Sequence, residues 1–131
     1  VEGARRRPRP PLRSAEAVFR HRAPRLRGRE REVFVVLLLG GKHRLQAEPE
    51  VSLGTLTSRL VHPREVFRPA IEAGAAALVL VHNHPSGDPT PSAEDRAVTR
   101  QLTAAGRTLG VPVLDHVVIG DGRWRSVLPS G

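Results

Sequence analysis

The fold of this chain is decided by the stretch from Ala75 to Asp95, which reads AAALVLVHNHPSGDPTPSAED. Its first seven residues, up to Val81, are all apolar, and so short a continuous apolar run predicts a buried β-strand. Side chains alternate along a strand, so His82 and His84 would point to the same face if the extended backbone continues through both. Two imidazole rings on one face can reach a single metal ion.

A loop and then a helix are predicted after the second histidine. Proline and glycine residues between positions 85 and 91 exclude a regular element there. Ser92 is a good helix N-cap, and Asp95 falls at the third helical position, where its carboxylate can point back toward the end of the strand. Two histidines and one aspartate leave one position of a tetrahedral zinc ion open, which is the arrangement of catalytic zinc sites.

The same residues also have a structural interpretation. A His-x-His pair occurs by chance in many sequences, and Asp95 could act only as the reciprocal half of a capping box with Ser92. The spacing alone therefore favours a metal site and a structural loop about equally.

The wider sequence resembles a known family. His-x-His, ten residues and then Asp, with a serine three positions before the aspartate, resembles the JAMM motif of the JAB/MPN metallopeptidases. Within that group the chain is most similar to the bacterial RadC family, which is named for a supposed role in DNA repair. The matching segments are HPREVFRPAIEAGAAALVLVHNHPSGDPTPSAEDRAVTRQL (His62–Leu102) and LDHVVIGDGRW (Leu114–Trp124). The resemblance extends over about residues 14–128 and departs from the family at Gly40, where an acidic or amide residue is usual.

This resemblance implies an α/β fold of the JAB/MPN, deaminase-like type, in which helices flank a curved, mixed β-sheet. It also implies a zinc-dependent metallopeptidase or isopeptidase acting on a peptide or protein substrate, with Zn²⁺ held by His82, His84 and Asp95. Glu32 would be the general base that takes a proton from the attacking water. Ser92 would donate a hydrogen bond to the developing oxyanion.

The strongest strand signal lies in Glu32–Leu39, where the sequence EVFVVLLL is apolar on both faces. A Gly-Gly turn then predicts a hairpin into Arg44–Ala47. The pattern alone does not separate Glu32 from Glu30 as the base, and a glutamate at a strand start is more often simply solvated. The resemblance selects Glu32.

The remaining elements complete a mixed sheet with helices on its faces. They are a short helix from the N-cap Ser14 that Pro24 interrupts, with a second turn to Leu26 and a stop at Gly28, a strand-like segment over Val51–Val61, helices over Pro63–Ala73 and Ala93–Leu109, and strands over Val111–Ile119 and Arg123–Val127. The helix over Pro63–Ala73 is predicted to bury one stripe, formed by Val66, Phe67, Ala70 and Ile71.

Four other residues are candidates for supporting roles. His62 precedes a helix, and a capping or packing role is favoured over a direct role in the site. Asp115 and His116 are adjacent in a predicted strand and face opposite sides, so only one of them could support a metal ligand; a buried, hydrogen-bonded pair is equally favoured. Trp124 is predicted to pack on the final strand.

Length and composition indicate a single small domain. A chain of 131 residues supports one core, no apolar run is long enough to span a bilayer, and the start does not resemble a signal peptide. The absence of cysteine excludes disulfides, thiolate ligands and the cysteine half-site of zinc deaminases. These features favour a cytoplasmic protein with no membrane partner. Because the sequence contains no methionine, we expect it to be part of a longer protein.

The whole basic excess lies in the N-terminal quarter. Residues 1–31 carry eleven arginines and three glutamates, whereas residues 32–131 carry ten basic and ten acidic residues. Residues 1–13 are predicted to be a basic disordered tail or linker, and residues 14–131 the folded domain. Residues 1–31 could contact nucleic acid phosphates non-specifically, although a solvated tail is the favoured interpretation.

Two other functional classes follow from these observations. One is a DNA-associated, repair-type protein that binds nucleic acid through residues 1–31, as the family's name implies. The other is a non-catalytic MPN scaffold, which is disfavoured because the chain keeps the whole set of motif residues.

Overall fold

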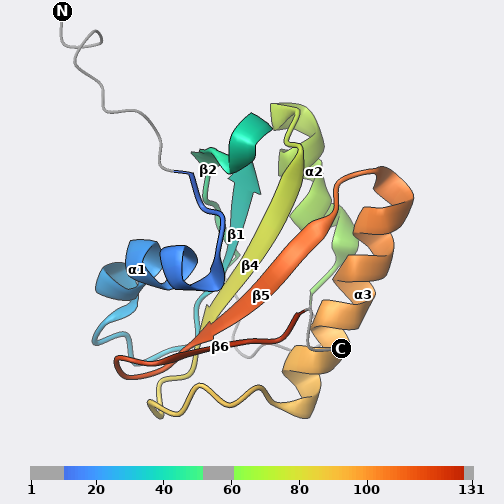
Figure 1. The fold of residues 1–131 in the computed structure, drawn as a ribbon. Coiled ribbons are helices and arrows are strands. Elements are labelled where there is room, and N and C mark those ends of the chain that lie inside the picture. The colour runs from blue at the N-terminus through green and yellow to red at the C-terminus, as the bar shows by residue number, and fades with distance from the viewer. Residues whose placement is uncertain (1–10, 52–60, 129–131) are drawn as a thin grey trace, which may run out of the picture.

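The structure, a computed structural model, describes residues 11–51 and 61–128. In chain order the elements are α1 (Ala15–Leu26), β1 (Phe34–Leu39), the 3₁₀ helix η2 (Gly41–His43), β2 (Leu45–Ala47), β3 (Glu50–Val51), α2 (Pro63–Ala73), β4 (Ala77–Asn83), α3 (Ala93–Leu109), β5 (Val113–Ile119) and β6 (Trp124–Ser126). The described strands form one mixed sheet in the order β2-β1-β4-β5-β6, with β3 also paired to β1 (Figure 1). A mixed α/β sheet flanked by helices is the predicted fold class.

The strand that leads to the histidines, β4, is central in the sheet. It is antiparallel to β1, with Phe34 opposite His82, and parallel to β5, with Val118 opposite His82. All seven residues of β4 are buried, which explains why its sequence is apolar rather than alternating. Helix α3 lies in the crossover that a parallel pair of strands requires.

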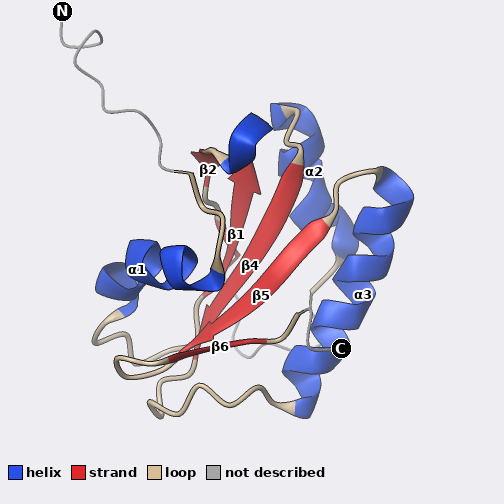
Figure 2. Ribbon diagram, viewed as in Figure 1, coloured by secondary structure: helices blue, strands red, loops and turns tan. Residues whose placement is uncertain are grey.

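Helices cover both faces of the sheet (Figure 2). One cluster of buried side chains joins Val79 and Val81 of β4 to α1, and the other joins Leu78 and Leu80 to α2 and α3. Odd-numbered residues of β4 therefore face α1, and even-numbered residues face α2 and α3. His82 is even-numbered, so the strand places it on the face that α2 and α3 cover.

The helices begin and end where the sequence predicts. The Ser14 and Ser92 side chains cap α1 and α3, and Gly74 and Gly110 end α2 and α3 in the left-handed conformation, with φ of 65° and 75°. The expectation that Pro24 interrupts the first helix is wrong, because α1 continues through Pro24 to Leu26. None of the described helices combines the length and apolar character needed to cross a membrane.

The packed structure begins earlier than the boundary that we placed before Ser14. Leu12 is 4% exposed and belongs to the core on the α1 face, and its backbone N–H bonds the His43 carbonyl at 2.9 Å. Arg13 donates a hydrogen bond to the carbonyl of Lys42. Residues 1–10 of the predicted tail lie outside the described residues.

The predictions for Ile71 and for the segment Val51–Val61 are not confirmed. Ile71 is 56% exposed, although we placed it on the stripe with the buried residues Val66, Phe67 and Ala70. At about 100° of rotation per residue, Ile71 lies at the margin of the arc that those three define. Most of the predicted segment Val51–Val61 falls outside the described residues.

An ion-pair network ties α1 to the segment that joins β2 and β3. Arg22, only 3% exposed, bonds Glu48 at 2.9 Å and Glu50 at 3.2 Å, and His21 and Arg25 also contact Glu48. Burial by itself raises the pKa of Glu48, but the hydrogen bonds from Arg22 and His21 outweigh it and lower that pKa. Part of the basic excess of the N-terminal quarter is therefore neutralised within the domain.

We expect Glu48→Gln to lower the free energy of unfolding by about 1–3 kcal/mol at neutral pH, because it leaves the buried Arg22 with Glu50 alone, at 3.2 Å, as its anionic partner. The pKa of Glu48 is lowered by folding, so its contribution is complete above its ordinary value of 4.5 and is lost as the pH falls through the folded value. Urea unfolding at a series of pH values should show the wild-type advantage at neutral pH and its disappearance in acid.

The matched control is Glu16→Gln. Glu16 pairs with Arg20 at 2.6 Å on the exposed surface of α1, and exposed pairs of this kind contribute about 0.5 kcal/mol or less. Equal losses in the two variants would show that burial of Arg22 gives the network no special weight.

Candidate metal centre

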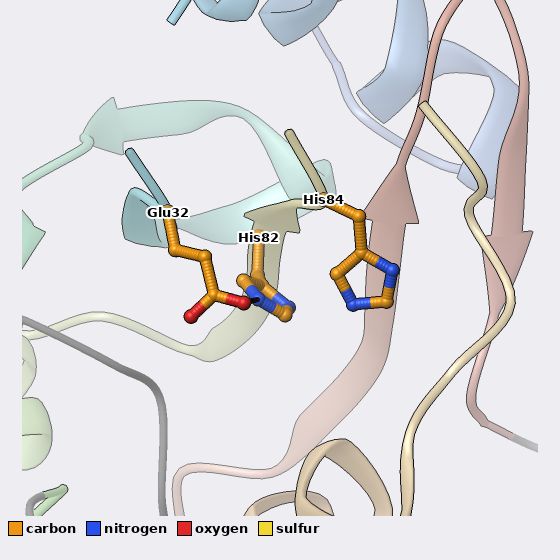
Figure 3. Close-up of side chains that lie close together, drawn as sticks. All are labelled: Glu32, His82 and His84. Atoms are coloured by element: carbon orange, nitrogen blue, oxygen red, sulfur yellow. Dashed lines mark ion pairs between the residues drawn. The ribbon is translucent and has the colours of Figure 1, made fainter. Parts of the chain in front are cut away.

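His82 and His84 lie next to each other at the end of β4 (Figure 3). His82 is 1% exposed. The backbone N–H of His84 donates to the carbonyl of Ile119 at 2.9 Å, so the extended pairing with β5 continues one residue past β4. The two rings share one face, as the sequence predicts, with centroids 4.8 Å apart and planes at 81°.

Asp95 reaches both histidines from the first turn of α3. Its Oδ1 lies 3.3 Å from His82 Nδ1, and its Oδ2 lies 3.0 Å from His84 Nε2. The same Oδ2 accepts the backbone N–H of Ser92 at 2.8 Å, while Ser92 Oγ accepts the N–H of Asp95 at 3.0 Å. The capping box and the contact with the histidines, which the sequence left as alternatives, are thus made by one carboxylate.

Glu32 approaches the histidines from the residue pair that precedes β1. Its Oε1 lies 3.5 Å from His82 Nε2, and the ligand-type atoms of Glu32, His82 and His84 all lie within 4.8 Å of one another (Figure 3). Glu30 is exposed and lines a cavity of about 490 Å³ on the α1 side of His84. The structure therefore separates the two glutamates that the pattern alone could not.

The charge states of His82 and Asp95 suit a divalent metal. Burial lowers the pKa of His82, which favours the neutral imidazole that metals bind. Burial alone would raise the pKa of Asp95, but hydrogen bonds from His84 and from the Ser92 backbone lower it to about 2. Both nitrogens of His82 are buried without a hydrogen-bond partner in the described part of the chain. Imidazole nitrogen and carboxylate oxygen are the donors of many zinc sites.

The loop after β4 fixes the orientation of His84. Its Nδ1 lies 2.8 Å from the carbonyl oxygen of Asp88, which can only accept, so Nδ1 carries the proton. In the neutral ring Nε2 bears the lone pair that a metal needs, whereas the hydrogen bond to Asp95 requires a second proton at Nε2 and raises the pKa of His84. The loop is held by a close approach to the β5–β6 turn: a Cβ added at Gly120 would lie 2.2 Å from the Gly87 carbonyl oxygen.

Asn83 holds the backbone on both sides of Glu32, a role that the sequence analysis missed. Its side chain is buried, and Oδ1 accepts the N–H of Val33 at 2.5 Å while Nδ2 donates to the carbonyl of Arg31 at 3.2 Å. The position of Asn83 between two histidines is the only sequence signal for it. Three consecutive residues of this strand end thus act on the same centre from both faces of the sheet.

His116 is the member of the Asp115–His116 pair that lies beside the candidate metal centre. It is fully buried, its ring centroid is 5.9 Å from that of His82, and its Nδ1 lies 2.6 Å from Thr99 Oγ1. Burial lowers the pKa of His116 to about 3. Asp115 accepts hydrogen bonds from Ser126 Oγ and from the Leu128 backbone, so the two neighbours do face opposite sides. The sequence analysis did not identify Thr99.

The other candidates take simpler positions. Ser92 is exposed, and its Oγ uses a lone pair for the N–H of Asp95, so the hydroxyl proton is not needed for the cap. His62 is the exposed N-cap residue of α2, and its side chain makes no capping hydrogen bond. Trp124 packs against the core on the α1 face, as predicted.

We expect Asn83→Ala to lower the free energy of unfolding by about 1–3 kcal/mol, because the buried N–H of Val33 loses its acceptor. Amide hydrogen exchange should accelerate at Val33. The N–H of Val36, which bonds the Pro49 carbonyl at 3.0 Å farther along β1, is the internal control and should stay protected. If amide exchange at Val33 is unchanged in Asn83→Ala, the role assigned to Asn83 is wrong.

Comparisons with known proteins identify the family of the chain and its relatives. The family model described as a RadC-like JAB domain matches residues 12–131. A UPF0758 protein of Geobacter sulfurreducens is 52% identical over 118 residues, which cover 90% of this chain and 52% of the relative. A UPF0758 protein of Syntrophotalea carbinolica is 49% identical over 136 residues, covering 99% of this chain and 60% of the relative. One from Methanosarcina acetivorans is 45% identical over 118 residues. The chain spans about half the length of the curated relatives it matches, and it belongs to the RadC-like JAB domain family.

Proposed function

We propose that this domain is a zinc-dependent hydrolase that cleaves a peptide or isopeptide amide bond. The observation that carries the proposal is the convergence of two histidines and two carboxylates at the end of β4. Membership of the JAB domain family supports it, because the motif residues of that family are all present here.

In this proposal His82, His84 and Asp95 hold the metal and Glu32 is the base. The two carboxylates differ in a way that suits these roles. The side chain of Asp95 is 2% exposed and contacts both histidines, whereas that of Glu32 is 30% exposed and contacts one. A general base must meet water, and a metal ligand benefits from burial and a fixed position.

When bound, zinc would supply Lewis-acid polarisation and would lower the pKa of a water molecule to about 7. Glu32 takes the proton of the attacking water and passes it to the leaving amine. Asn83 keeps the Glu32 backbone in place through its bonds to residues 31 and 33. The Ser92 hydroxyl donates a hydrogen bond to the oxyanion, while a lone pair of the same oxygen continues to cap α3.

The nucleic-acid alternative is less well supported. Residues 1–10, which carry four of the eleven N-terminal arginines, lie outside the described residues. Arg22, Arg25 and Arg29 are engaged with Glu48 and Glu50 inside the domain. Contact of the N-terminal segment with nucleic acid therefore stays a prediction.

The purified protein should contain about one zinc ion per chain, and the His82→Ala/His84→Ala variant should contain none. Elemental analysis of both proteins measures this directly. The control His62→Ala removes an exposed histidine and should keep the metal. If the wild type takes up no zinc even after incubation with it, the proposed function is wrong and the stretch is a structural loop.

Glu32→Gln should keep its zinc and lose about 10²–10⁴-fold in the rate of amide hydrolysis, because the amide cannot accept a proton from water. The rate is measured on a panel of peptide and isopeptide substrates, with Glu30→Gln as the matched control that keeps wild-type activity. Full activity of Glu32→Gln would remove Glu32 from the mechanism. Loss of zinc from Glu32→Gln would instead make this residue a ligand.

A further inference from the structure

We infer that Thr99 and His116 form a positioning pair that holds Asp95 in place as a metal ligand. The proposed function gives neither residue a role as a metal ligand or as the base. Both are almost fully buried, with 1% of Thr99 and 0% of His116 exposed. The inference rests on the proposed function in one respect, which is that Asp95 binds the metal.

The hydrogen bonds of Thr99 have only one consistent direction. Its Oγ1 lies 2.6 Å from the carbonyl oxygen of Asp95 and 2.6 Å from His116 Nδ1. A carbonyl oxygen can only accept, so the single hydroxyl proton of Thr99 goes to Asp95. His116 Nδ1 must therefore be the donor to Thr99 Oγ1.

This direction fixes the tautomer of His116. Complete burial without a carboxylate partner keeps the imidazole neutral, so it has one N–H group, and that group is at Nδ1. Nε2 then bears a lone pair, and it has no hydrogen-bond partner in the described part of the chain. The chain of bonds from His116 through Thr99 to Asp95 would be lost in the other tautomer. Nδ1 would then bear a lone pair, and the single hydroxyl proton of Thr99 could not go both to Nδ1 and to the Asp95 carbonyl.

The pair acts at the point where α3 must be aligned with the sheet. His116 is paired in register with Leu80 of β4, two residues before His82. Thr99 is one helical turn after Asp95, so the pair connects the turn that carries Asp95 to the strand next to β4. The capping box with Ser92 fixes Asp95 only within its own helix. The bond to His116 fixes that helix turn relative to the histidines.

The chain offers a matched pair of substitutions on one helix. Thr108 makes the same kind of bond, from its Oγ1 to the carbonyl four residues earlier, Ala104, at 3.3 Å, but it is exposed and has no histidine partner. Thr99→Val and Thr108→Val therefore remove the same local bond, and only Thr99→Val also removes the link to β5.

The experiment uses the full chain. It measures Co²⁺ affinity from the visible absorption of the bound ion, and Zn²⁺ affinity from its competition with Co²⁺. We expect Thr99→Val to bind Co²⁺ about 10–100-fold more weakly than wild type, as is typical for loss of a group that supports a ligand, with an altered absorption spectrum. Thr108→Val should bind like wild type, and Thr99→Ser, which keeps the hydroxyl, should recover most of the affinity. Unfolding curves of each variant establish that the titrated protein is folded.

The outcomes separate the inference from the proposed function. A Thr99→Val protein that is less stable but binds Co²⁺ like wild type would show a purely structural role and overturn the inference. Wild-type protein that binds neither Co²⁺ nor Zn²⁺ would overturn the proposed function and the inference together. The tautomer is tested without any variant: ¹⁵N-histidine NMR should place the proton of His116 on Nδ1, and a proton on Nε2 would overturn the inference even if Thr99→Val does not fold.

Discussion

The carboxylate of Asp95 is used twice, by the N-terminus of α3 and by the two histidines at the end of β4, and the rest of the centre is arranged around that double use. Its Oδ2 accepts from the Ser92 backbone at 2.8 Å and lies 3.0 Å from His84 Nε2. A carboxylate has several lone-pair directions, so one oxygen can serve a cap and a histidine together. The N-terminus of α3 therefore fixes the position of the Asp95 carboxylate, eleven residues after His84, relative to the two histidines.

The strand contributes a second constraint through its alternation. His82 and Asn83 are neighbours in sequence but face opposite sides of the sheet, and each is buried by a different set of helices. His82 faces the candidate metal centre, while Asn83 holds the backbone of residues 31 and 33, on either side of Glu32. All of β4 is buried, and hydrogen bonds are electrostatically stronger in such an interior than in water, so burial strengthens the contacts of both residues.

Local pattern was enough to predict β4, the caps of α3 and the shared face of His82 and His84, because period-two alternation and a Ser-x-x-Asp cap are encoded within a few residues. It could not predict Thr99 or Asn83, whose partners lie 17 and 50 residues away and depend on how helices and strands align. Glu30 and Glu32 have the same chemistry, so only the path of the chain into β1 separates them. The exposure of Ile71 shows the same limit, since the width of a buried helix stripe depends on what packs against it.

Several of the buried polar atoms that lack a hydrogen-bond partner in the described part of the chain lie at the candidate metal centre. Of the seven buried side-chain atoms without a hydrogen-bond partner in the described part of the chain, three belong to His82 and His116. Each such atom costs about 1–3 kcal/mol, and native folds keep them rare. Thr99 and Asp95 lie beside these two rings and are both hydrogen-bonded, so the unsatisfied atoms at this place are ring nitrogens. A neutral imidazole has one nitrogen with a free lone pair, so a cation bound to His82 would offset the cost of one of these three nitrogens.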